Sequence, residues 1–400
     1  MSVLRLPPPP LERRMRLAPP RPIDPMPLLR AGLRAAWRGL SLARLTTLAA
    51  LQDPKGGALL LKSASTDVYE NLGLEDWLHE CVQPRDREVL LLWRNRPAVV
   101  IGRHQNPWQE CNLKLMRDKG VRLSRRKSGG GTVYHDLGNI NVTFFTSKKG
   151  YDRRSNLELI ISALRRIRPH LDIIATDRLD LLLNRAFKIS GTASKIGRTT
   201  AYHHCTLLCH SDSSLLTSVL RTPYQGLKSN ATRSRHADVK NLGEEDPTLT
   251  CDILMDAIAV EYSRRRGLQN QILLVDPKDA LALPGVDRFT QELKSWDWIY
   301  GRTPKFSVNH TFSVNHNLSR AEVKLSMNIS HGRIESCNIE DLSDWLPSEM
   351  CDQLAGDLIG SRFCPTETMI LANAHLRVCS PDSMLHNKLN LFCEQVRAIM

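Results

Sequence analysis

The sequence has no apolar run close to the roughly 20 residues that a membrane-spanning helix needs, so no membrane span is expected. Its ten cysteines are scattered and include no Cys-x-x-Cys pair. A chain of 400 residues, 42% of them hydrophobic, can bury a sizeable core without disulfide bonds, so we expect reduced thiols in a cytosol-like or matrix compartment. The nucleotide-binding pattern Gly-x-x-x-x-Gly-Lys-Ser/Thr is also missing. ATP, if the protein uses it, would have to bind through another loop.

Acidic residues are scarce at the N-terminus. Residues 1–52 hold nine arginines, no lysine and only Glu12 and Asp24, and this segment carries more than half of the formal net charge of +13. The rest of the chain is mildly basic and has no recognition helix, zinc-finger spacing or RNA-binding aromatic motif. Nucleic acid is therefore not an expected partner.

The same segment has the features of a mitochondrial transit peptide. A proline run at Pro7–Pro10 predicts disorder over residues 1–26, and Arg30, Arg34 and Arg38 then recur at helical spacing. A surface helix or a helix lying on a membrane is the alternative. We interpret residues 1–62 as a transit peptide and disordered leader, and we expect the protein in the mitochondrial matrix.

Three consecutive glycines, within the string R-R-K-S-G-G-G-T-V-Y-H-D-L-G-N at Arg125–Asn139, organise the remaining sequence. Without a Cβ the backbone can approach a ligand closely, and its N–H groups can converge on phosphate or carboxylate oxygens. Arg125, Arg126 and Lys127 add positive charge. A plain glycine turn between two strands is the alternative. The longer pattern indicates a site for an anionic small molecule.

Two further motifs flank this loop in the sequence. One reads G-R-H-Q-N-P-W-Q-E-C-N at Gly102–Asn112; the other reads F-K-I-S-G-T-A at Phe187–Ala193 and is followed by H-H-C-T-L-L at His203–Leu208. In this order, the three motifs resemble the signatures of the lipoate–protein ligase and lipoyltransferase family, from about Ser65 to the C-terminus. The resemblance is closest to the mitochondrial lipoyltransferases of animals.

The patterning predicts an α+β fold. It indicates a helix with N-cap Asn106 that stops at Gly120, a polar loop at Gly191–Thr200, a helix from Pro247 to Arg266 capped by Asp246, and a linker at Leu273–Pro284. The resemblance implies two domains. A large mixed-sheet catalytic domain like that of biotin and lipoate ligases would cover residues 63–275, and a small α+β accessory domain would cover residues 284–400.

The resemblance implies that Lys188 is catalytic. An ammonium at that position would lie across the acyl carbonyl and the phosphate of lipoyl-AMP, where it stabilises the developing oxyanion and the leaving AMP. An exposed strand lysine is the alternative. The implied substrate-binding residues are Arg126, Ser128, Gly129, Gly130, Gly131, Thr132, Val133, His135, Asp180, Gly191, Ala193, His204 and Thr206.

Two positions depart from the family pattern. Leu179 stands where ligases that activate free lipoate carry Asn, and Cys205 stands where members often carry Gly. Asp180 is retained and would place Mg²⁺ only if ATP is used. The histidines and cysteines near His203 lack a second ligand pair at zinc spacing, so no resident metal is expected.

The sequence therefore favours a transferase that uses a preformed donor, either lipoyl-AMP or a lipoylated H protein. The expected acceptors are lipoyl domains of 2-oxo-acid dehydrogenase acyltransferase subunits, and the glycine cleavage H protein is a further partner. No tightly bound cofactor is expected, and the protein is expected to be a monomer. The alternatives are a complete ATP-dependent ligase, an octanoyl- or lipoyl-amidotransferase with Cys205 as nucleophile, and a non-catalytic carrier-binding scaffold.

Overall fold

The computed structural model describes residues 57–81, 87–224, 226–269, 272–316, 319–341, 344–378 and 384–400. The leader predicted over residues 1–62 therefore lies almost wholly outside the described residues. Its last residues overlap strand β1 (Leu59–Ser63), in which Leu60 and Leu61 are buried.

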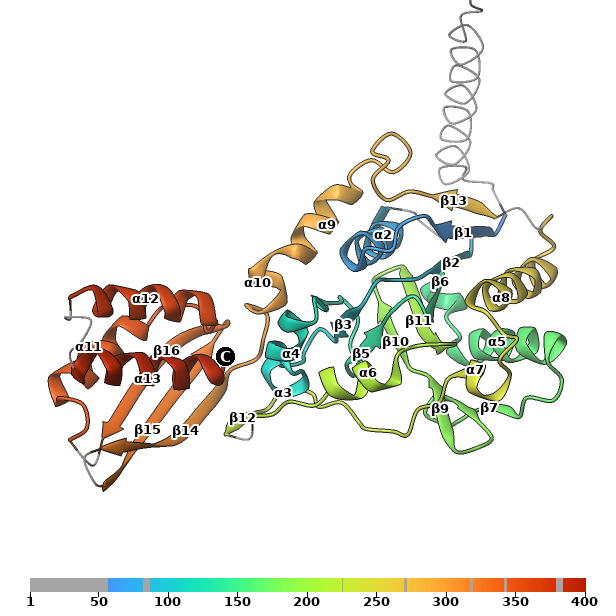
Figure 1. Ribbon diagram of the computed structural model, residues 1–400. Helices are drawn as coiled ribbons and strands as arrows, with labels where there is room; N and C mark the ends of the chain where they lie inside the picture. Colours follow the sequence, from blue (N-terminus) through green and yellow to red (C-terminus); the bar gives the residue numbers. More distant parts are fainter. Residues whose placement is uncertain are drawn as a thin grey trace, which may run out of the picture. The chain divides into compact units, whose positions relative to one another are not determined.

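A six-stranded mixed sheet forms the centre of the larger part of the chain (Figure 1). Its strand order is β10-β11-β6-β2-β1-β13. Strand β1 runs parallel to both β2 and β13, whereas the β2–β6, β6–β11 and β11–β10 pairs are antiparallel. The strands are β2 (Val89–Trp93), β6 (Asn139–Ser147), β10 (Thr192–Ile196), β11 (Thr200–Leu208) and β13 (Leu273–Val275). The predicted α+β fold with a large mixed sheet is confirmed.

Two helix pairs cover the two faces of this sheet (Figure 1). Helices α5 (Arg153–Ile167) and α8 (Cys251–Arg266) pack on Leu90 and Leu92, while α2 (Val68–Cys81) and α9 (Val286–Lys294) pack on Leu91. Successive strand residues point to opposite faces, so the continuous apolar run of β2 serves both cores.

Two small sheets carry the residues that the motifs single out. In the first, β3 (Ala98–Ile101) lies between β4 (Arg122–Arg125) and β5 (Val133–His135), and the glycine loop joins β4 to β5. In the second, β8 (Leu181–Leu183) lies between β7 (Ile173–Ala175) and β9 (Phe187–Ser190), which bears Lys188.

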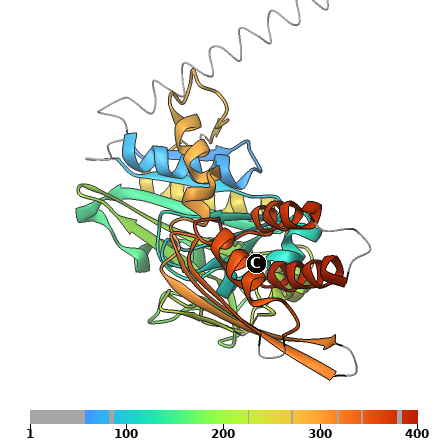
Figure 2. The ribbon, with the colours of Figure 1, turned by 90° about the vertical axis from the view of Figure 1, so that its left-hand side faces the viewer.

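A four-stranded antiparallel sheet and three helices occupy the C-terminal part (Figure 2). The sheet has the order β12-β14-β15-β16. Its strands are β12 (Leu227–Ser229), β14 (Phe306–His316), β15 (Ser319–Ser330) and β16 (Arg333–Asp341), and its helices are α11 (Ser348–Leu358), α12 (Pro365–Val378) and α13 (Met384–Ala398). Strand β12 belongs to the predicted catalytic domain, which ends at residue 275, yet it pairs with β14. Both predicted domains fall within one compact unit, so their division at residues 275 and 284 stays a prediction.

Four local predictions were wrong, and tertiary context explains them. The predicted loop at Gly191–Thr200 contains β10, whose pairing with β11 overrides its small polar composition. The predicted linker contains β13, which is held by parallel pairing with β1. The helix expected from Asn106 to Gly120 is broken into α3 (Pro107–Glu110) and α4 (Leu113–Asp118), because Asn112 caps a second start. Helix α8 begins at Cys251 because the Thr250 side chain caps it.

The remaining elements are short: the 3₁₀ turn η1 (Lys148–Gly150), α6 (Ser213–Val219), α7 (Leu242–Glu245) and α10 (Trp296–Ile299). None of the helices in the described ranges is both long and apolar enough to cross a lipid bilayer.

Candidate active site

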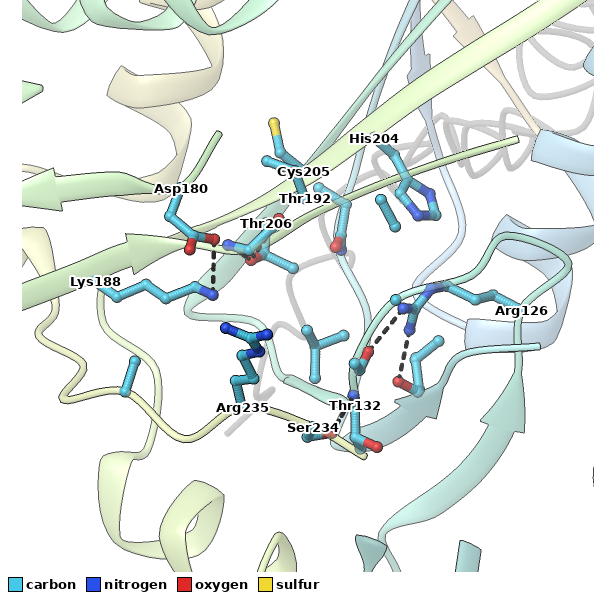
Figure 3. Close-up of a pocket in the computed structure, with 18 of the residues that line it drawn as sticks. Arg126, Thr132, Asp180, Lys188, Thr192, His204, Cys205, Thr206, Ser234 and Arg235 are labelled. Carbon is cyan, nitrogen blue, oxygen red and sulfur yellow. Dashed lines mark hydrogen bonds and ion pairs between the residues drawn. The ribbon is translucent and has the colours of Figure 1, made fainter. Parts of the chain in front are cut away.

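A cavity of about 400 Å³ opens between the glycine loop, strands β9 and β11, and the segment Thr232–Ala237 (Figure 3). It brings together most of the residues that the motifs predicted, although they come from stretches far apart in the sequence. Those that line it are Arg126, Gly130, Gly131, Thr132, Val133, His135, Asp180, Lys188, Gly191, Ala193, His204 and Thr206. Ser128 and Gly129 do not line it.

An unusual dihedral angle at Gly130 and a close approach of Gly102 to the loop backbone explain two of the glycines here. Gly130 has a φ of 88°, which side chains rarely adopt, and a Cβ at Gly102 would collide with the Gly130 carbonyl oxygen. Within the described part of the chain, the amide N–H groups of Gly129, Gly130 and Gly131 donate to no acceptor. The loop therefore offers backbone donors beside the cavity.

The Arg126 side chain holds the loop from inside. Its Nη2 donates to the carbonyl oxygens of Gly129 (2.6 Å) and Gly131 (2.7 Å), its Nη1 to Val100 (3.0 Å), and its Nε to the Ser128 hydroxyl (2.9 Å). Burial lowers the pKa of Arg126 to about 10. The guanidinium that reaches the cavity wall is thus already engaged by the loop.

The neighbouring cations lie away from the cavity. Arg125 is fully buried and donates to the carbonyl oxygens of Ile299 and Gln105, at 2.6 and 2.7 Å, among others. Lys127 pairs with Glu292 at 3.0 Å. The basic run before the glycines therefore supports the fold around α10 and α9 more than it charges the cavity.

Lys188 points into the cavity and meets Asp180, with 2.8 Å between Nζ and Oδ1 (Figure 3). Both side chains are about a quarter exposed, at 25% and 27%. The β8–β9 turn at Asn184 and Arg185 uses two residues with positive φ, which aligns the hairpin that carries both groups. The Lys188 backbone is pinned separately, because its N–H donates to the Asp238 carbonyl at 2.8 Å.

Leu179, next to Asp180, adopts a left-handed φ of 65°. Asn tolerates this region and Leu does not favour it. The turn is closed by bonds from Leu179 N to the Thr176 carbonyl and from Thr176 N to the Asp180 carbonyl, both 2.9 Å. The backbone conformation at position 179 is therefore one that suits asparagine, the residue that the family resemblance led us to expect, although leucine stands there.

Sequence reasoning missed the segment Thr232–Ala237, which lines one wall. Ser234 anchors it, since Thr132 N donates to its hydroxyl at 2.8 Å and Gln105 Nε2 does so at 3.0 Å. The Ser234 hydroxyl also donates to the Glu110 carboxylate. The basic run Arg233-Ser234-Arg235 was a visible signal, but its position depends on hydrogen bonds to residues more than a hundred positions earlier.

The lining is strongly cationic. Its one carboxylate is Asp180, whereas Arg153, Arg178 and Arg235 present guanidinium groups that make no hydrogen bond or ion pair elsewhere in the described chain. Such an arrangement attracts an anion.

Another part of the wall is apolar and is formed by Leu72, Trp93, Val100 and Val133. An apolar surface of this kind suits an apolar part of a ligand.

Two other groups in the wall are held neutral by burial. Burial lowers the pKa of His135 to about 3 and raises the pKa of the Cys205 thiol to about 12. At neutral pH the cysteine is therefore a thiol, a poor nucleophile. In the described part of the chain, no three His, Cys, Asp or Glu side chains gather as a metal site.

Comparison with known proteins gives a consistent result. A family model of the lipoyl protein ligase A/B catalytic domain matches residues 67–263. The human protein named lipoyl amidotransferase LIPT1, mitochondrial, is 56% identical over 342 residues, which cover 86% of this chain and 92% of that protein. Lipoate-protein ligase A of Psychrobacter cryohalolentis is 35% identical over 309 residues, with 76% and 88% covered.

Solved structures agree on the fold. P. falciparum LipL1 in complex with lipoate has a TM-score of 0.54 at 26% identity and covers 86% of this chain and 98% of its own. A bipartite lipoate protein ligase from Thermoplasma acidophilum, described with its E2 lipoyl domain, has a TM-score of 0.51 at 22% identity, with 66% and 99% covered.

Proposed function

The chain belongs to the lipoate–protein ligase and lipoyltransferase family as a mitochondrial acyltransferase, and we propose that it transfers a preformed lipoyl group to the lysine of lipoyl domains. The observation that supports the proposal is that Lys188 lines one cavity together with apolar side chains and with guanidinium groups that have no partner in the described chain.

The two-part cavity supports lipoyl-AMP as the donor. The lipoyl chain and its dithiolane ring are apolar and suit the wall around Trp93 and Val100. The phosphate is anionic and suits Arg178 and Arg235, together with the free N–H groups of the glycine loop. The acyl carbonyl would then lie at the boundary between the two parts, within reach of Lys188.

The proposed step is a simple acyl transfer. The neutral amine of the acceptor lysine attacks the acyl carbon, the bond to the phosphate oxygen breaks, and AMP leaves while the amine loses a proton. Lys188 stabilises the negative charge that develops on the carbonyl and phosphate oxygens. Asp180 holds the ammonium at 2.8 Å and keeps it directed into the cavity.

A lipoylated H protein is a second candidate donor, favoured by the name amidotransferase carried by the human relative. In that case the donor amide C–N bond breaks and the released lysine amine takes up a proton. The same carbonyl oxygen needs stabilisation, so Lys188 keeps its role. The acceptors we propose are lipoyl domains of 2-oxo-acid dehydrogenase acyltransferase subunits, and we propose a monomeric enzyme without a tightly bound cofactor.

We do not propose that the protein activates free lipoate. Leu179 supplies no side-chain amide. Its neighbour Asp180 would be the remaining residue to hold Mg²⁺ with ATP. The buried, protonated thiol of Cys205 argues against a covalent thioester route. A non-catalytic scaffold would have no need of the Lys188–Asp180 pair in the cavity.

Intact-mass spectrometry of an apo lipoyl domain tests the proposal. The domain is incubated with the protein and one of three donors: lipoyl-AMP, lipoylated H protein, or lipoate with ATP and Mg²⁺. A domain whose acceptor lysine is replaced by arginine is the matched control. We expect the lipoyl mass gain with one or both preformed donors. Equally fast modification from lipoate and ATP would identify a complete ligase, and no modification from any donor would support a scaffold.

A further inference from the structure

A chain of four polar side chains runs from helix α2 to the glycine loop. Glu75 Oε1 receives a hydrogen bond from His204 Nδ1 at 2.9 Å, His204 Nε2 lies 3.0 Å from the Ser128 hydroxyl, and Ser128 receives the Arg126 Nε–H at 2.9 Å. Glu75 and Ser128 are each 1% exposed. None of the sequence motifs includes Glu75.

The donors and acceptors in this chain have one consistent order. Because the carboxylate of Glu75 only accepts, the contact requires a proton on His204 Nδ1, and the neutral imidazole that carries it there leaves Nε2 to accept. The Ser128 hydroxyl then donates to His204 and accepts from Arg126. The positive end of the chain therefore lies at Arg126 and the negative end at Glu75. Thr143 strengthens the negative end by donating to the same Glu75 oxygen at 2.7 Å.

This order of serine, histidine and carboxylate is also that of a hydrolytic triad, but the serine here is not placed for attack. Ser128 is buried, does not line the cavity, and has both of its hydroxyl contacts engaged. The chain instead ends on the guanidinium that orients the carbonyl oxygens of Gly129 and Gly131. Each peptide group is planar, so fixing these carbonyl oxygens also fixes the N–H groups of the following residues.

We propose that Glu75 is a positioning residue for the acyl-transfer reaction, acting through His204, Ser128 and Arg126 to hold the amide donors of the glycine loop in their catalytic geometry. This inference rests on the proposed function. It predicts that breaking the chain lowers the rate of the chemical step more than it weakens donor binding, because alignment matters most in the transition state.

Two pairs of variants test the inference by steady-state transfer from lipoyl-AMP to an apo lipoyl domain, with thermal melting in parallel. Ser128→Ala removes the middle link, and Ser124→Ala is its control, since Ser124 is fully buried and its hydroxyl bonds nothing in the described chain. Glu75→Met removes the acceptor, whereas Glu75→Gln keeps an oxygen at the position that accepts both bonds.

We expect Ser128→Ala and Glu75→Met to lower kcat by about ten- to a hundredfold, with KM for lipoyl-AMP changed less than about threefold. Ser124→Ala and Glu75→Gln should stay within about threefold of the wild-type kcat, because they leave the chain of hydrogen bonds unbroken. All four should melt within a few degrees of the wild-type protein.

Normal kcat in Ser128→Ala and Glu75→Met would overturn the inference. So would losses that follow thermal destabilisation or unfolding at the assay temperature, because the chain would then serve only the stability of the fold. Either outcome is compatible with lipoyl transfer by the wild-type protein, so it contradicts the inference and not the proposed function. A wild-type protein that transfers nothing from any donor contradicts the proposed function instead.

Discussion

Replacing Lys188 by alanine should slow lipoyl transfer by about a hundred- to a thousandfold, or roughly 3–4 kcal/mol in the activation barrier. The physical reason is the loss of the ammonium that, in the proposed mechanism, stabilises the reacting carbonyl; removing one oxyanion donor typically has an effect of this size. Some loss of lipoyl-AMP affinity should accompany it, because the proposed mechanism has the same charge in contact with the phosphate of the bound donor. Arginine should not restore the rate fully, because a planar guanidinium does not fit the place of a compact ammonium.

The fold should tolerate this change. The Lys188–Asp180 pair is about a quarter exposed, and pairs near solvent contribute about 0–1 kcal/mol to stability. The backbone bonds of Lys188 to Asp238 and Lys240 do not depend on the side chain. For a protein of this size we therefore expect a fall in melting temperature of less than about 4 °C.

Single-turnover transfer to an apo lipoyl domain, with melting curves in parallel, is the assay. Arg185→Ala is the control. Arg185 lies on the same β8–β9 hairpin, but its partner is Asp172 at 3.2 Å and its side chain is 75% exposed outside the cavity. A Lys188→Ala protein that melts normally and transfers at the rate of the Arg185→Ala control would remove Lys188 from the mechanism.

Four further changes have expected outcomes. Leu179→Asn should raise the free energy of unfolding by about 0.5–1 kcal/mol in urea titrations, because it relieves a left-handed leucine; a decrease would contradict this. Burial raises the pKa of Asp76 to about 7. The contribution of this group to the free energy of unfolding is therefore full below about pH 4 and is lost as the pH rises through about 7. Asp76→Asn should flatten that fall, and an unchanged pH profile would refute the assignment. Cys205→Ser should keep transfer within about threefold of wild type, and abolished transfer would restore the thiol route. Deleting residues 1–56 should preserve cooperative melting, whereas deletion through Ser63 removes β1 from between β2 and β13 and should abolish it.

Local patterns and the family resemblance predicted the parts of the site that are continuous in sequence. The glycine loop lies between β4 and β5, and its Gly130 has the positive φ that only glycine adopts readily. The β8–β9 turn likewise uses positive φ at Asn184 and Arg185, and Asn is one of the residues that tolerate this region. These features depend on conformational preferences of single residues, which the sequence reports directly.

Features that depend on residues far away in the sequence could not be predicted from local patterns. Four of the five residues of strand β10 are small or polar, and its pairing with β11 makes it a strand. Lys195 within it looks like a plain loop lysine. It lies 3.7 Å from Asp76, a carboxylate that is buried to 2% exposure. Residues at positions 76 and 195 come together through packing of α2 on the sheet, and no local pattern indicates that contact.

The motif at Gly102–Asn112 supports the cavity although its polar side chains lie outside it. Its side chains Gln105 and Glu110 do not line the cavity. They hold Thr132 of the glycine loop and Ser234 of the adjacent segment Thr232–Ala237, with Thr132 Oγ1 at 2.9 Å from Gln105 Oε1. Trp108 of the same motif packs on Phe306 and Phe363, with ring centroids 5.2 and 5.3 Å apart. One motif therefore joins two walls of the cavity to the core of the C-terminal part. Position in the sequence likewise does not indicate which cations can bind an anion. The cations nearest to the glycines in sequence donate to backbone carbonyl oxygens or pair with Glu292. The cavity-lining guanidinium groups that have no partner in the described chain come instead from Arg153, Arg178 and Arg235.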